Sequence, residues 1–354
     1  MGASPMAGER RTLRDALRSR LLFGLLPALL ATALLVGVGA VMVSGPVAPG
    51  SDDVAMMTIP NGVSSREIAV RLEQAGIIRD QLFFRLFLRM SGADGRVQAG
   101  EYSLGPGMSM TEVVSRLVRG EVTLHAVTIP EGLTVAGVIQ LLVDSGWGDL
   151  ATFQELLEDP GLRPVWLPED PRIRRSLEGY LFPDTYFFPR GISERAILQA
   201  MRRRFDDEVD LLFKERAGEL GLTVHQVVTL ASIVEREAQV AEERTIVAAV
   251  FHNRLRRRMR LESCATVRYA LDKDPQEPLF YRDLESPSPY NTYRQDGLPP
   301  GPIAAPGRAS LQAAVHPAGV KYLFFVARGD GSHAFALTLA AHERNVRKYG
   351  AGFR

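Results

Sequence analysis

The clearest helical signal in this chain lies in residues 223–238, Thr-Val-His-Gln-Val-Val-Thr-Leu-Ala-Ser-Ile-Val-Glu-Arg-Glu-Ala. Thr223 and Gln226 stand three residues apart, which is the spacing of a capping box. In this motif each of the two side chains accepts a hydrogen bond from the backbone amide of the other residue. The sequence therefore predicts a helix that begins at Val224.

Two glutamates near the end of this predicted helix occupy different faces. The apolar stripe of the helix contains Val227, Leu230 and Val234. At about 100° of rotation per residue, Glu237 lies about 20° from Leu230 and therefore falls inside the stripe. Glu235 lies about 140° from Leu230, so we expect it to face solvent or a neighbouring loop. The two acids are not equivalent.

The position of Glu237 indicates a chemical role. Burying an ionised carboxylate is costly unless it is paired, so a carboxyl group in an apolar stripe tends to hold its proton near neutral pH. A general acid must carry a proton before it acts, and Glu237 is therefore a candidate. Two structural alternatives stay open: Glu237 pairs with Arg244 or Arg268, or the helix ends there and leaves the carboxylate exposed.

Three similar segments occur upstream of this helix. They are Thr58-Ile-Pro-Asn-Gly-Val-Ser-Ser, the looser Leu104-Gly-Pro-Gly-Met-Ser-Met-Thr, and Thr128-Ile-Pro-Glu-Gly-Leu-Thr-Val. Each predicts a short strand, a Pro/Gly turn and a helix whose N-cap is Ser or Thr. The pattern fits a repeated structural unit, or a small carbohydrate-binding-like module that resembles LysM. The residues alone leave both interpretations open.

A loop is predicted downstream, where residues 286–293 read Ser-Pro-Ser-Pro-Tyr-Asn-Thr-Tyr and precede a run rich in Pro and Gly. Tyr290, Asn291 and Tyr293 offer aromatic faces and an amide, which suit a sugar ligand. The alternative is an ordered surface loop whose tyrosines pack inward. The later stretch Tyr322–Ala327 predicts a buried strand, and the body of the chain predicts an α+β fold.

The N-terminal region predicts a membrane anchor. Five arginines, from Arg10 to Arg20, precede an uncharged apolar run from Leu21 to Val43. This run exceeds the roughly 7 to 15 apolar residues of a signal-peptide core and reaches the about 20 that a membrane-spanning helix needs. We expect a cytoplasmic tail over 1–20, a single span over 21–44, a linker over 45–55, and a body outside the membrane. A cleaved signal peptide is the alternative.

Composition excludes several classes of function. The 354 residues carry 42 Lys and Arg against 41 Asp and Glu, a net charge of +1, which lacks the basic excess that nucleic-acid binding needs. Cys264 is the only cysteine, and the six histidines are scattered. We therefore expect no disulfide, no metal, no cofactor and no nucleic-acid partner.

Five motifs give the chain a family resemblance. They are Leu230-Ala-Ser-Ile-Val-Glu-Arg-Glu-Ala, Phe251-His-Asn-Arg-Leu, Ser288-Pro-Tyr-Asn-Thr-Tyr, Gly297-Leu-Pro-Pro-Gly-Pro-Ile-Ala and Ala314-Val-His-Pro-Ala. Together they resemble the membrane-anchored endolytic murein transglycosylases, the YceG-like or MltG family. The resemblance implies a LysM-like module over 56–126 and a catalytic domain over 127–350.

The resemblance also implies an activity and a location. Family members cut nascent peptidoglycan strands between N-acetylmuramic acid and N-acetylglucosamine, leave 1,6-anhydro ends and in this way end strand elongation. By this resemblance Glu237 is the single acid/base residue, and Asn291, Tyr290, Tyr293, Thr266 and Glu235 bind the substrate. Glycan strands and peptidoglycan synthases are the implied partners, and the bacterial inner membrane is the implied location.

One departure from the family bears on mechanism. Where members commonly have Thr-Asp-Pro-Thr, this chain has Ser263-Cys264-Ala265-Thr266, so Cys264 replaces an aspartate. A lytic enzyme needs one carboxylate, whereas a hydrolase normally needs two. A murein hydrolase that uses Glu262 or Asp283 as its second carboxylate is one alternative. A wall-binding scaffold without catalysis is the other.

Overall fold

The computed structural model describes residues 26–209, 211–274 and 277–350. The predicted cytoplasmic tail over 1–20 and the first residues of the predicted span, 21–25, lie outside the described residues. Helix α2 covers Leu26–Ser44 and contains no charged residue. Within the described ranges, no single helix meets the length and composition needed to cross a membrane alone; Phe213–Glu219 and Val224–Glu237 meet them only together, with a bend of 91°.

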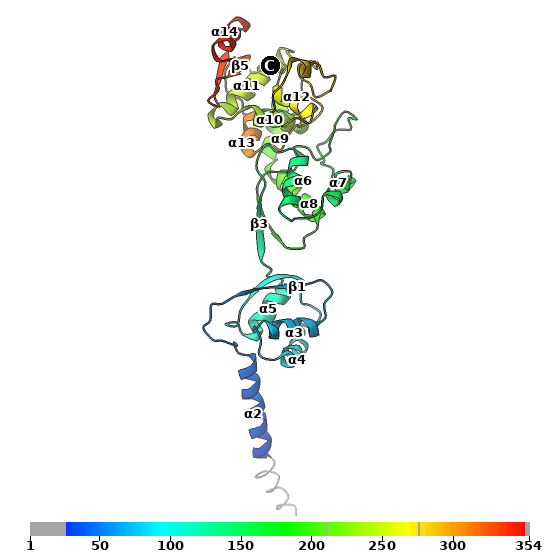
Figure 1. Ribbon diagram of the computed structural model, residues 1–354, viewed down its shortest axis with the longest axis vertical. Helices are drawn as coiled ribbons and strands as arrows, with labels where there is room; N and C mark the ends of the chain where they lie inside the picture. The colour runs from blue at the N-terminus through cyan, green and yellow to red at the C-terminus, as the bar shows by residue number, and fades with distance from the viewer. Residues whose placement is uncertain (1–25, 210, 275–276, 351–354) are drawn as a thin grey trace, which may run out of the picture. The chain divides into compact units, whose positions relative to one another are not determined.

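The chain divides into two compact units, between Leu124 and His125. In the first unit, strand β1 pairs antiparallel with β2, and Ala55 lies opposite Leu104. Helix α2 belongs to the same unit, and the helices that follow it there are labelled in Figure 1. The elements of this unit after α2 are β1 (Ala55–Ile59), α3 (Ser65–Gln74), α4 (Gln81–Met90), β2 (Gly100–Leu104) and α5 (Met110–Arg119).

Two helices of the first unit, α3 and α5, begin where the repeated segments predict. Ser64 caps α3 by accepting a hydrogen bond from the Glu67 amide, and Ser109 caps α5 through the Glu112 amide. Both hydroxyls satisfy amides that have no partner inside their helices. The apolar faces of these helices meet the strands in one buried cluster.

The second unit opens with a small sheet and its covering helices. The third repeated segment lies here, and Thr134 caps α6 through the Gly137 amide. Val138, Ile139 and Leu142 of α6 are buried in a cluster with residues of β4 and α8. The elements are β3 (Leu124–Thr128), α6 (Val135–Asp144), α7 (Leu150–Leu157), β4 (Thr185–Pro189), which pairs with β3, and α8 (Glu194–Glu208).

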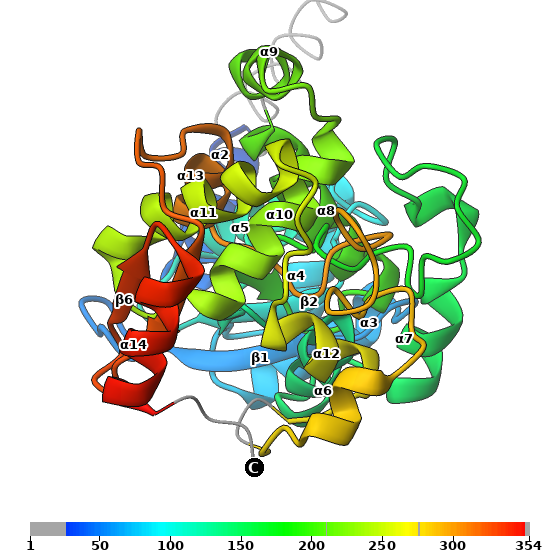
Figure 2. The same cartoon turned by 90° about the horizontal axis from the view of Figure 1, so that it is seen from above.

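Helix α10 organises the rest of the second unit. It covers Val224–Glu237, and the capping box between Thr223 and Gln226 is present, as predicted. It contacts α9, α11, α12 and α13 (Figure 2). The remaining elements are α9 (Leu211–Glu219), α11 (Arg244–Arg256), α12 (Cys264–Ala270), α13 (Arg308–Val315), β5 (Phe324–Ala327), its antiparallel partner β6 (His333–Ala336) and α14 (Leu339–Tyr349). The predicted mixed α+β architecture is confirmed.

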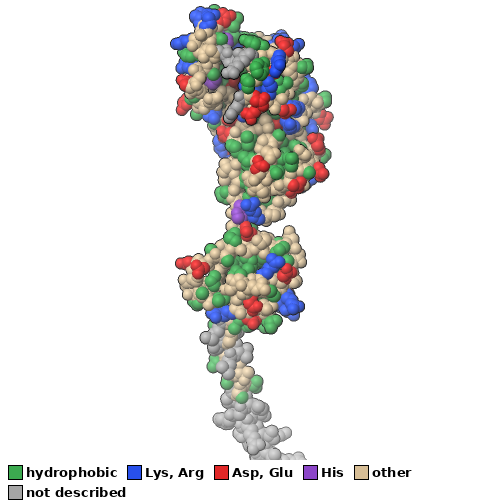
Figure 3. All heavy atoms as spheres, in the orientation of Figure 1, with side chains coloured by type: hydrophobic (Ala, Val, Ile, Leu, Met, Phe, Trp, Pro, Cys, Tyr) green, Lys and Arg blue, Asp and Glu red, His purple; other side chains and the backbone are tan. Residues whose placement is uncertain are grey.

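Helix α10 is buried on more faces than the single apolar stripe of the sequence predicted. Val228, Ala231 and Ser232, which lie away from the predicted stripe, are 0% exposed. Neighbouring helices cover the opposite face as well, and Ser232 satisfies its hydroxyl by donating to the Thr229 carbonyl and accepting from the Ile303 amide. The helix is therefore enclosed, and Glu237 stands at its C-terminal end. Acidic and basic side chains are interspersed over the face of this unit visible in Figure 3.

Candidate active site

Glu237 lies where two cavities meet. It is the last residue of α10 and is half-buried. It lines a cavity of about 1010 Å³ and also a second cavity of about 410 Å³. The residues that line both cavities are Glu237, Cys264, Arg268, Ala327 and His333. A long chain-like ligand could therefore contact Glu237 while occupying space in both cavities.

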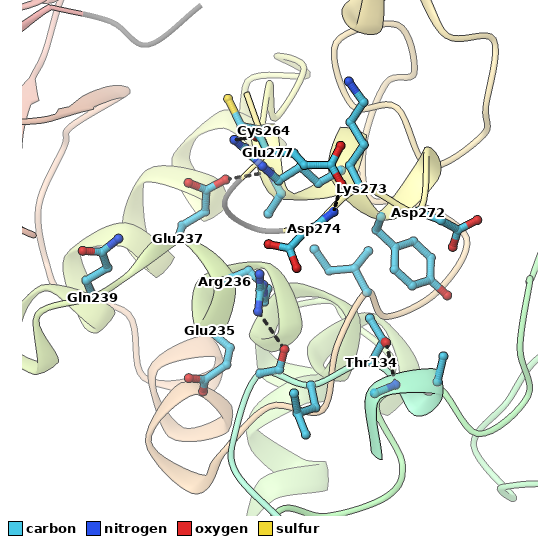
Figure 4. A pocket seen from close by; sticks show the side chains of 18 of the residues that line it. Thr134, Glu235, Arg236, Glu237, Gln239, Cys264, Asp272, Lys273, Asp274 and Glu277 are labelled. Carbon is cyan, nitrogen blue, oxygen red and sulfur yellow. Dashed lines mark hydrogen bonds between the residues drawn. The ribbon is translucent and has the colours of Figure 1, made fainter. Parts of the chain in front are cut away.

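Two donors fix the orientation of the Glu237 carboxylate. The Ser263 hydroxyl donates to Oε1, and the Ala265 amide donates to the same atom at 3.3 Å. Both donors belong to the start of α12, toward which Glu237 points in Figure 4. None of the described residues donates to Oε2. One oxygen is thus held by the protein, and the other can react with a ligand.

Cys264 places a neutral group beside Glu237. Its Sγ lies 3.3 Å from the Tyr293 hydroxyl. Burial, followed by the nearby Glu237 charge, raises the pKa of the Cys264 thiol to about 11. Burial also raises the pKa of Tyr293. Both groups are therefore uncharged near neutral pH, whereas an aspartate at position 264 would ordinarily carry a negative charge.

Thr266 has a different position from the one expected of a substrate-binding residue. It is 0% exposed and lines neither cavity. Its hydroxyl donates to the Ser263 carbonyl at 2.8 Å and contacts the Thr292 hydroxyl, which accepts from the Ser263 amide. This placement favours a role in holding Ser263 over direct contact with substrate.

The loop that carries Tyr290 and Asn291 packs inward, which is the alternative that the residues left open. Asn291 is 0% exposed, and its Nδ2 donates to the carbonyls of Leu284 and Ser286, both at 2.8 Å. Tyr290 is also buried, and its hydroxyl accepts from the Arg174 amide at 3.2 Å. Neither lines either of the two cavities that Glu237 lines, whereas Tyr293 lines the smaller one. The sequence could not distinguish a binding loop from a packed one.

Glu235 faces a neighbouring loop rather than solvent. Its side chain is 8% exposed, and Oε2 accepts from the Gly307 amide at 3.1 Å. Nη2 of Arg244 lies 3.9 Å from Oε1. Figure 4 shows Glu235 and Glu237 pointing to different sides of α10. Burial and the Glu235 charge together raise the pKa of nearby Glu131, and the opposing effect of the Arg244 charge is smaller. Glu235 still lines the larger cavity.

The two candidates for a second carboxylate are paired with cations. Glu262 lines the smaller cavity and pairs with Arg254 at 2.9 Å. Asp283 pairs with Lys273 at 2.6 Å, and this hydrogen bond lowers the pKa of Asp283. Asp283 lines neither cavity. Across the part of the chain that the structure describes, no group of three or more His, Cys, Asp or Glu side chains could hold a metal ion.

Comparisons with known proteins identify relatives over most of the chain. A family model described as the YceG-like family matches residues 57–348. The endolytic murein transglycosylase of Bacillus subtilis strain 168 is 34% identical over 317 residues, which cover 86% of this chain and 87% of that protein. The protein of the same name from Streptococcus pneumoniae R6 is 30% identical, with coverage of 86% and 60%. The crystal structure of a YceG-like protein from Listeria monocytogenes aligns with a TM-score of 0.58 and 31% identity, covering 83% of this chain and 100% of that one.

Proposed function

Because this chain belongs to the YceG-like family, we propose that it is an endolytic murein transglycosylase. It cuts peptidoglycan glycan strands between N-acetylmuramic acid and N-acetylglucosamine and leaves 1,6-anhydro ends, which ends strand elongation. The observation that carries this proposal is the position of Glu237, half-buried where two cavities meet and with one carboxylate oxygen held by Ser263 and Ala265.

In the proposed reaction Glu237 first acts as the acid. Its Oε2 donates a proton to the glycosidic oxygen as the bond to the muramyl anomeric carbon breaks. The 6-hydroxyl of the same muramyl residue attacks that carbon, and the Glu237 carboxylate accepts the hydroxyl proton. Because the 6-hydroxyl of the sugar is the nucleophile, Glu237 alone can both donate the proton and accept one back. Oε1 stays bound to its two donors throughout, which keeps the reacting oxygen in place.

The pairing of the other acids supports a lytic over a hydrolytic reaction. A hydrolase needs its second carboxylate at about 5 to 5.5 Å for retention or about 6.5 to 9.5 Å for inversion, able to attack or to activate water. Glu262 and Asp283 are each paired with a cation. A lytic reaction needs neither, and it also tolerates Cys264 in place of the family's aspartate.

The same proposal assigns supporting roles to the remaining site residues. Tyr293 lines the smaller cavity and offers its ring to a sugar. Asn291 and Tyr290 hold the loop that carries Tyr293, because their polar atoms bind backbone groups. Thr266 holds Ser263, and Glu235 lies along the wall of the larger cavity.

Membrane attachment and domain roles are further parts of the proposal. The uncharged run Leu21–Val43 and the arginines before it support a single span over 21–44 in the inner membrane, with the body on the outer side and synthases within reach. The succession β1, α3, α4, β2 and α5 supports a LysM-like module over 56–126. The catalytic domain then covers 127–350.

Mass spectrometry of digested peptidoglycan tests the reaction. The full chain should release fragments that end in 1,6-anhydromuramic acid, and Glu237→Gln should release none. Ordinary reducing ends would indicate a hydrolase, and an absence of cleavage products from the wild type would indicate a wall-binding protein.

A further inference from the structure

Arg268 lines both of the cavities that Glu237 lines. We infer that its guanidinium binds a carboxylate of the muramyl residue and so selects which glycosidic bond reaches Glu237. This inference rests on the proposed function, because it takes the glycan strand of peptidoglycan as the ligand. Arg268 belongs to α12, the same helix whose first residues hold Oε1 of Glu237. The cation and the acid are therefore positioned by one element.

The guanidinium of Arg268 has unused hydrogen-bonding capacity. Its Nη2 donates to the Glu277 carbonyl at 2.9 Å, while Nε is buried and has no hydrogen-bond partner among the described residues. No described carboxylate pairs with it. The other cavity-lining cations that do have carboxylate partners are Arg175 with Asp272, Lys273 with Asp283, and Arg254 with Glu262.

Arg236 is the useful contrast. It also has no described carboxylate partner, but its Nη1 donates to the Gly132 carbonyl at 2.9 Å, and it lines only the larger cavity. Arg268 is distinguished by lining both cavities. A ligand group bound to Arg268 would lie in space that Glu237 also lines in both cavities, whereas one bound to Arg236 is restricted to the larger cavity.

The chemistry of the strand matches this cation. Its two alternating sugars differ by the lactyl ether of muramic acid, which carries a carboxyl group. In a strand without peptides that group is a free carboxylate; in a substituted strand it is amide-linked, and the peptide supplies its own carboxylates. Guanidinium groups bind carboxylates through paired, charge-assisted hydrogen bonds. Since only the muramyl residue offers this anion, Arg268 can fix the register of the strand relative to Glu237.

Binding measurements on the full chain test the inference separately from catalysis. In the Glu237→Gln background, we would compare Arg268 with Arg268→Gln on three matched strands: peptide-bearing, amidase-stripped with free lactyl carboxylates, and stripped with those carboxylates converted to methyl amides. The loss of a charge-assisted hydrogen bond should weaken binding of carboxylate-bearing strands roughly ten- to hundredfold. Binding of the neutral strand should not change, and Arg268→Lys should recover part of the loss.

The outcomes identify the source of the carboxylate. A loss confined to peptide-bearing strands assigns the peptide carboxylates, and a loss on stripped strands assigns the lactyl group. Arg172→Gln is the matched control, because Arg172 pairs with Asp170 and lines neither cavity. Equal loss on all three strands, or no loss on any, would overturn the inference. A wild-type protein that makes no anhydro ends would instead overturn the proposed function and leave these binding results to be judged by themselves.

Discussion

Ser263 is the N-cap residue of α12, yet its hydroxyl donates to Oε1 of Glu237 and makes no hydrogen bond to its own helix. An N-cap serine ordinarily accepts from an amide of the first helical turn, which stabilises the helix by about 0.5–2 kcal/mol. Here the hydroxyl orients the acid instead. The Thr292 hydroxyl accepts from the Ser263 amide, and Thr266 donates to the Ser263 carbonyl, so the backbone of this serine is held on both sides.

Glu237→Gln should abolish cleavage without unfolding the protein. The amide is nearly isosteric but cannot donate the proton, and loss of a general acid lowers rates roughly 10²- to 10⁴-fold or more. The measurement is the yield of anhydro ends alongside the melting temperature. Glu235→Gln is the control and should lower the cleavage rate less, because that carboxylate accepts from the Gly307 amide and points to a different side of α10. Equal loss in the two variants would contradict the assignment.

Removing either donor to Oε1 should lower kcat more than it changes KM. Ser263→Ala removes the hydroxyl, and a lost hydrogen bond to a charged group corresponds to roughly ten- to hundredfold. Ala265→Pro removes the amide donor at a first-turn position, where helices tolerate proline. Ser263→Thr and Ala265→Ser keep the donors and should retain most activity. A pure KM effect would indicate that these residues bind substrate.

Asn291→Ala should destabilise the fold rather than lower turnover of the folded protein. The substitution leaves the carbonyls of Leu284 and Ser286 and the Tyr293 amide buried without this partner, at a cost of roughly 1–3 kcal/mol for an unsatisfied group. Thermal denaturation and activity per folded molecule separate the effects. A stable variant with a low kcat would show that Asn291 contacts the substrate directly.

Stability should depend on the protonation of Glu178. This residue is 1% exposed, and burial raises the pKa of its carboxyl from 4.5 to about 7. The folded protein binds the proton more tightly than the unfolded chain, so the stabilising contribution is complete below pH 4.5 and is lost as the pH rises through about 7. The glutamine of Glu178→Gln cannot ionise, so the melting temperature of this variant should depend less on pH over this range. Exposed Glu285→Gln is the control, and identical pH profiles for all three proteins would refute the prediction.

The orientation in the membrane can be tested on spheroplasts. Added protease should digest the body after Gly45 and spare the N-terminal tail, because the arginines before Leu21 favour the cytoplasmic side. Antibodies against each end of the chain would report the products. A soluble form lacking residues 1–45 in intact cells would favour a cleaved signal peptide.

Local chemistry explains which features the sequence could predict. Helix starts at Ser64, Ser109, Thr134 and Thr223 depend on residues within one turn, and all four caps are present. The different directions of Glu235 and Glu237 follow from helical geometry alone. The mixed fold follows from the alternation of such segments.

Long-range packing explains what the sequence could not predict. Ser263 meets Glu237 across 26 residues because α12 packs against α10, and no periodicity reports that contact. The polar faces of Tyr290 and Asn291 suit a sugar as well as a packed loop, and only the positions of Leu284, Ser286 and Arg174 decide between the two. The one feature of the sequence that drew attention to the segment containing Ser263 is Cys264, which replaces the aspartate common in the family.

The raised pKa of the Cys264 thiol has a practical consequence for handling this protein. A thiol with a pKa of about 11 is ionised in only about one molecule in ten thousand at pH 7, and the thiolate is the form that reacts with alkylating and oxidising reagents. Iodoacetamide or a maleimide should therefore label the folded chain slowly and the denatured chain quickly. The labelling rate therefore reports on the surroundings of Glu237 at a single site, because the sequence contains no other sulfhydryl.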